Sequence, residues 1–120
     1  MRSYFVFFVV DEVDDDLAAA VRGRVRMLAG SRAWLNEPGF FDDPAAAHDG
    51  VRTTGGFLRV EAEVADGDDV RAFCGAIQAL SAEYEVDVEL QWREAVLGRV
   101  RAGVPDDGLE EKLSAVCGGG

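Results

Sequence analysis

The sequence predicts an α+β domain built around an antiparallel sheet, and three observations favour this class. Residues 4–10 form a run of aromatic and β-branched side chains, which is typical of a buried strand. Residues 17–28 and 70–80 carry apolar side chains at the spacing of an amphipathic helix. Residues 83–92 alternate apolar and mostly acidic side chains, as a strand with one wet face does.

The first two elements are a strand and a helix. The run YFVFFVV, residues 4–10, has no polar member, so we expect a central strand that is buried on both faces. An acidic run at 11–16 follows, and Asp at the start of a helix caps free amides and matches the positive end of the helix dipole. Gly30 is a stop signal for this helix.

Residues 31–50 are predicted to be a long loop. The segment contains Asn36 and His48, which are the only Asn and His of the chain, and turn formers at Pro38 and Pro44. A lone His among acids suggests an active site, but no nucleophile and no second metal ligand accompanies it. The loop interpretation is therefore preferred, with a short capped helical turn at 45–48.

A hairpin and a second helix are predicted next. Gly55 and Gly56 separate two extended runs, which is a signal for a two-residue hairpin turn. The acids of the segment 66–69 then open a helix whose apolar stripe is Val70, Phe73, Ile77 and Leu80. Cys74 borders that stripe and is expected to be a small core residue, because no base lies near it in the sequence.

The order strand, helix, hairpin, helix, strand predicts a ferredoxin-like βαββαβ two-layer sandwich with both helices on one face of an antiparallel sheet. We expect residues 1–117 to form this single domain. A short extra helix is predicted within 105–117, with a capping box from Asp107 to Glu110, and 118–120 are expected to be a flexible tail.

Composition excludes several functions. The chain has 12 Lys+Arg against 23 Asp+Glu and a net charge of -11, which opposes binding to nucleic acid and to anionic membranes. No apolar run approaches the roughly 20 residues of a membrane span, and acids at 11–16 argue against a signal peptide. Two distant cysteines fit a reducing compartment, so a cytoplasmic location is expected.

No catalytic, metal or cofactor site is predicted. The acids at 11–16 lack the central Gly and final Glu of a calcium loop, and there is no phosphate-binding glycine motif. Carboxylates are so abundant that no pair stands out for acid–base chemistry. We therefore expect no cofactor, and a non-enzymatic role is favoured over an enzymatic one.

The predicted functional surface is the sheet face opposite the helices. One of two apolar rows of the first strand must face it, beside charged residues of neighbouring strands. Such a face is covered by the loop, by a second copy, or by another protein. The predicted protein-binding residues are Phe5, Phe7, Arg59, Glu61, Glu63, Glu85, Asp87 and Glu89.

An aromatic centre with an acidic rim suggests a non-catalytic binding domain, such as an inhibitor- or immunity-like partner of a basic nuclease or toxin. The alternative is a homodimeric enzyme or small-molecule binder with a pocket near 31–50, where Trp34, Asn36, His48 and Arg52 would gather. A third possibility is a homodimeric module with its open sheet faces pressed together.

Overall fold

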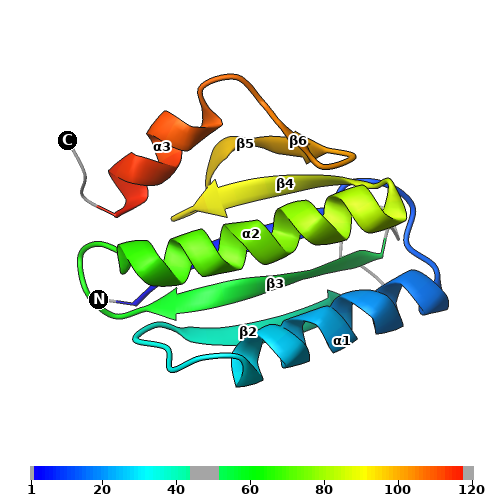
Figure 1. The fold of residues 1–120 in the computed structure, drawn as a ribbon, viewed down its shortest axis with the longest axis horizontal. Helices are drawn as coiled ribbons and strands as arrows, with labels where there is room; N and C mark the ends of the chain where they lie inside the picture. The colour runs from blue at the N-terminus through cyan, green and yellow to red at the C-terminus, as the bar shows by residue number, and fades with distance from the viewer. Residues whose placement is uncertain (1, 44–51, 118–120) are drawn as a thin grey trace.

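The computed structural model describes residues 2–43 and 52–117. Three helices and a six-stranded antiparallel sheet of order β2-β3-β1-β4-β5-β6 form an α+β fold (Figure 1). The elements in chain order are β1 Ser3–Val9, α1 Asp15–Gly30, β2 Glu37–Asp43, β3 Thr53–Val60, α2 Gly67–Tyr84, β4 Asp87–Trp92, β5 Ala95–Arg101, β6 Val104–Pro105 and α3 Leu109–Val116.

The core lies between one face of the sheet and the helices. In β1, Ser3, Phe5, Phe7 and Val9 are buried and alternate with more exposed residues. The rings of Phe5 and Phe7 each lie 5.6 Å from that of Phe73 in α2, so both face the helices. The prediction that Phe5 and Phe7 lie on the binding face is wrong, because only Tyr4, Val6 and Phe8 of this strand face the other way.

The two glycines predicted as a hairpin turn lie inside a strand. β3 is continuous from Thr53 to Val60 and pairs with β1 on one side and β2 on the other. A Cβ atom on Gly55 would lie 1.9 Å from the backbone oxygen of Phe7, and one on Gly56 would lie 2.7 Å from the Phe7 ring. Glycine is used here because the neighbouring strand approaches closely, which is a second meaning of glycine in an extended run.

The predicted loop at 31–50 contains a strand. β2 pairs with β3 from Glu37 opposite Arg59 to Asp43 opposite Thr53, so the loop prediction is wrong over 37–43. Pro38 is tolerated because β2 is an edge strand, where a missing amide hydrogen breaks no ladder. The predicted helical turn at 45–48, with His48, lies outside the described residues.

The C-terminal part contains two strands that the sequence analysis missed. β5 pairs with β4 through a tight turn at Arg93 and Glu94, which have φ values of 52° and 70°. β6 adds a short edge beside β5. The extra helix α3 is confirmed, but its N-cap is Gly108 with no side-chain cap bond, so the capping-box prediction is wrong.

Candidate protein-binding surface

The open face of the sheet, opposite the helices, carries a group of apolar side chains that we call the aromatic patch. α1 lies over β2 and β3, α2 over the centre of the sheet, and α3 beside β5 (Figure 1). None of the helices in the described part of the chain packs on the opposite face. The register places side chains of three adjacent strands together on that face, namely Tyr4, Val6, Phe8, Phe41 and Phe57.

The aromatic patch is partly exposed and internally packed. Tyr4 is 39% exposed, and the other four side chains are half-buried. The rings of Tyr4 and Phe57 meet edge to face with their centroids 5.5 Å apart. The Phe57 ring lies over Gly39, where a Cβ atom would come within 2.4 Å of it. The Phe57 ring therefore packs directly against the backbone of Gly39 on the edge strand.

Charged residues on both sides of the patch are paired. On the β4–β5 side, Arg99 lies 3.3 Å from Glu89 and Arg101 lies 3.9 Å from Asp87. On the β2–β3 side, Arg59 lies 3.1 Å from Glu37. The acidic row predicted on β4 is thus matched by arginines of β5, and the open face is far less negative than the predicted one.

The remaining predicted binding residues lie outside the strands. Glu61 and Glu63 follow the end of β3; Glu61 lies 3.8 Å from Arg59, and the Glu63 carbonyl accepts a hydrogen bond of 2.5 Å from Arg93. Glu85 is the C-cap of α2 in the left-handed conformation. Of the eight predicted residues, Arg59, Asp87 and Glu89 therefore occupy strand positions on the open face.

The predicted pocket residues that the structure describes, Trp34, Asn36 and Arg52, do not come together. Trp34 donates from Nε1 to the Leu28 carbonyl at 3.2 Å. The backbone amide of Asn36 donates to Asp69 at 2.7 Å, and its side-chain oxygen accepts from the amide of Asp66 at 3.0 Å. Asn36 thus has a structural role, because it joins the start of β2 to the N-terminus of α2.

Arg52 lies at the opposite end of the β2–β3 ladder. It donates to both carboxylate oxygens of Asp42, at 3.0 and 2.8 Å, and to Asp15 of α1 at 2.7 Å. The hydrogen bonds that Asp42 accepts from Arg52, and one of 2.6 Å that it accepts from Thr54, lower the pKa of Asp42 to about 2, and those from Arg52 are the main cause. This cluster ties the first turn of α1 to the sheet.

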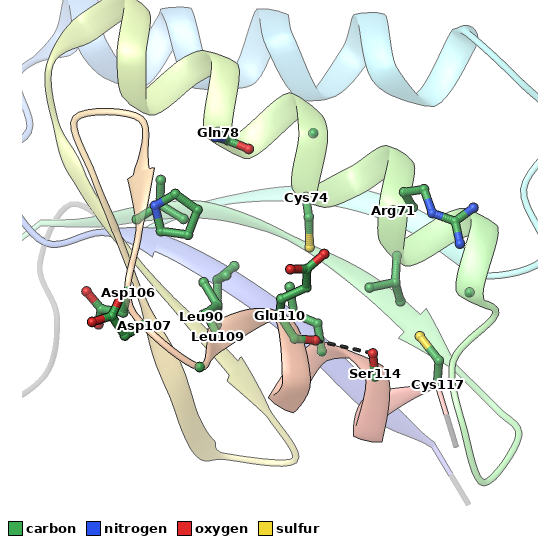
Figure 2. Close-up of a pocket in the computed structure, with 17 residues that line it drawn as sticks. Arg71, Cys74, Gln78, Leu90, Asp106, Asp107, Leu109, Glu110, Ser114 and Cys117 are labelled. Carbon is green, nitrogen blue, oxygen red and sulfur yellow. Dashed lines mark hydrogen bonds between the residues drawn. The ribbon is translucent and has the colours of Figure 1, made fainter. Parts of the chain in front are cut away.

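A groove of about 820 Å³ lies between α2 and α3, and the sequence did not predict it because β5 and β6, which were not predicted, help to line it. Figure 2 shows Cys74 pointing toward it from α2, with Leu109 and Glu110 on α3 opposite. Burial, with a smaller effect of Cys117, raises the pKa of Cys74 to about 12, so its thiol is neutral and unreactive at neutral pH. The apolar side chains at the bottom of this groove are almost inaccessible to solvent: Val70, Leu90, Val100 and Leu109 are 1–4% exposed.

Other kinds of site find no support in the described residues. No group of three or more His, Cys, Asp or Glu among residues 2–43 and 52–117 is arranged to hold a metal ion. Within the same ranges, every helix is too short or too polar to cross a membrane.

Comparison with known proteins gives no assignment. The chain matches no protein-family model, no curated protein and no solved structure. The surfaces described above are therefore the basis for a proposed function.

Proposed function

We propose that this protein is a non-catalytic protein-binding domain and that the open face of its sheet is the binding surface. The observation that carries the proposal is the aromatic patch: five apolar side chains lie together on a sheet face without a helix over it in the described part of the chain. Exposed apolar groups of this kind mark interaction sites more often than solvated surface. Rigid aromatic side chains lose little entropy when a partner covers them.

We further propose that the fold is of the ferredoxin-like type. The first six elements follow the order βαββαβ, and their four strands take the order β2-β3-β1-β4 in the sheet. On this proposal β5, β6 and α3 are additions at one edge. The proposal matters for function because this arrangement leaves one face of the sheet free of helices.

The inhibitor- or immunity-like role toward a basic nuclease or toxin is proposed on the net charge of -11, which would steer a basic protein toward the chain. Support at the open face itself is weaker, because Asp87 and Glu89 have arginine partners. The alternative of an enzyme or small-molecule binder near 31–50 has less support, since Asn36 and Arg52 lie at opposite ends of a ladder and interact with other residues.

Photo-crosslinking tests the binding surface. The amino acid p-benzoylphenylalanine replaces Tyr4 in the aromatic patch, or Met27, which is 71% exposed on α1, as the matched control. After irradiation in cells of the source organism, we expect protein adducts at position 4 and few at position 27. Equal labelling at both positions, or none at position 4, would contradict the proposal.

A further inference from the structure

We infer that the partner of the open face is a second copy of this chain, so that two sheets pack face to face across a twofold axis. This inference rests on the proposed function, since it names the occupant of the same surface. It depends on how charge is distributed over the sheet and on the size and position of the aromatic patch.

The charge on the open face favours a partner of the same kind. Arginines and acids of neighbouring strands pair across it, namely Glu37, Arg59, Asp87, Glu89, Arg99 and Arg101, and these six side chains sum to zero. Arg101 also lies 3.2 Å from Asp106, and Asp43 lies at the end of β2 on the same face, so the face has a small negative charge, whereas the whole chain has a net charge of -11. A surface built to capture a basic protein would present unpaired acids, as electrostatic complementarity requires. A face with so little net charge is where two strongly negative chains can approach with the least repulsion.

The Glu89–Arg99 pair shows that this neutralisation is built into the sheet. The Glu89 side chain is only 13% exposed, and Arg99 approaches it through two nitrogens, each 3.3 Å from Oε1. Gln91 donates to the other carboxylate oxygen at 2.8 Å. Both oxygens of Glu89 are thus occupied, and little of its charge is left for a basic partner.

The size of the face places the contact among small protein–protein interfaces. Four gaps of about 4.8 Å between strands, and seven residues at about 3.4 Å each, give a face of about 19 by 24 Å, or roughly 450 Å² in projection. Relief of the side chains adds to this, so two copies bury about 1,000 Å², near the lower limit for a specific interface. We therefore expect a dissociation constant of about 1–100 µM.

The position of the patch suits an isologous contact. Tyr4, Val6 and Phe8 lie on β1, and Phe57 lies on β3, and these two strands are inside the sheet rather than at its edges. A twofold axis through the patch brings apolar centre onto apolar centre, with the paired charges at the rim. Packed sheets of this kind lie about 10 Å apart, a separation that aromatic side chains fill.

Sedimentation equilibrium on the full chain tests the inference at low and high salt. We expect a reversible monomer–dimer equilibrium that tightens when NaCl rises from about 50 to about 500 mM, because salt screens the repulsion between like-charged chains. Val6→Arg, at the centre of the patch, should weaken dimerisation at least about 30-fold. Met27→Arg changes the net charge equally on α1 and should leave the dimer intact or slightly tighter.

Val6 is half-buried, so Tyr4→Arg is a second variant at the more exposed rim of the patch, and thermal unfolding by circular dichroism checks that both variants fold. A folded variant that still dimerises as the wild type does would overturn the inference. So would a wild-type chain that remains monomeric at both salt concentrations up to about 1 mM, which is well above the expected dissociation constant.

The crosslinking products separate this inference from the proposed function. Adducts of twice the chain mass at position 4, together with the dimer in solution, support a second copy. A monomer whose position 4 crosslinks to a different protein overturns the second copy but leaves the binding surface, and a basic partner would then explain it. A monomer without adducts at position 4 overturns both.

Discussion

Two glycine-to-alanine substitutions should change stability in opposite directions. Gly55 lies inside β3, and a Cβ atom there would be 1.9 Å from the backbone oxygen of Phe7 and 2.7 Å from the Cα of Phe8. Gly75 lies within α2, and a Cβ atom there would have no neighbour within 4 Å. The same methyl group therefore meets backbone at one position and open space at the other.

The magnitude at Gly55 comes from what must move. A carbon and an oxygen need about 3.2 Å, so β1 and β3 must separate by more than about 1 Å, which no rotamer change can avoid because the clash is with backbone. Separation weakens about two ladder hydrogen bonds, worth about 1 kcal/mol each, and loosens the contact of Phe7 with Phe73. We expect Gly55→Ala to lower the free energy of unfolding by about 3–5 kcal/mol.

At Gly75 the helix propensity decides the result. Alanine is favoured over glycine in a helix interior by about 1 kcal/mol, so Gly75→Ala should raise the free energy of unfolding by about that amount. Urea unfolding measured by circular dichroism gives both values from the shift in midpoint at constant slope. A loss below about 1 kcal/mol for Gly55→Ala would refute the close approach of the β1 backbone to Gly55, because a methyl group that meets backbone atoms cannot be accommodated at so small a cost.

Two further predictions concern the termini of α2 and of β2. Glu85→Gly should raise the free energy of unfolding by about 1 kcal/mol in urea titrations. Glycine adopts the left-handed conformation of this C-cap without strain, and the substitution removes a negative charge from the negative end of the helix dipole. An unchanged or lower free energy of unfolding would contradict the cap geometry. The pKa of Asp42 is lowered, so its contribution to stability is fully present above the ordinary pKa of 3.8 and is lost as the pH falls toward about 2. Asp42→Asn should therefore flatten the pH dependence of the free energy of unfolding between these two pH values. An identical pH dependence in both proteins would argue against the Arg52 contact.

The sequence was informative where one face of an element is buried. The apolar stripe Val70, Phe73, Ile77 and Leu80 predicted α2, and all four residues are buried in the core. Such periodicity has one physical cause: in a helix or strand with a single buried face, apolar side chains must recur every 3.6 residues or every 2 residues, respectively. The α+β class and an antiparallel sheet followed from these patterns.

The errors came from residues with more than one structural meaning. A Gly-Gly pair such as Gly55 and Gly56 fits a tight turn as well as it fits a strand that a neighbouring backbone approaches closely. Only the position of Phe7 decides between these two roles. In β5, Gly98 and the register shift opposite Leu90 and Gln91 of β4 interrupt the alternation that would mark a strand. The turn before it uses Arg93 and Glu94 in left-handed conformations where Asn and Gly are usual, so its signal was missing.

Missing β5 changed the functional argument more than any other error. An acidic row on β4 indicates a basic partner only if the next strand leaves those acids unpaired. Since Arg99 and Arg101 lie opposite Glu89 and Asp87, the net charge of the chain resides mainly elsewhere, on helix starts and connecting segments. Charge away from the sheet keeps the chains apart at long range without opposing contact at the aromatic patch. The same distribution is the reason why we expect a weak association through one face that tightens as salt is added.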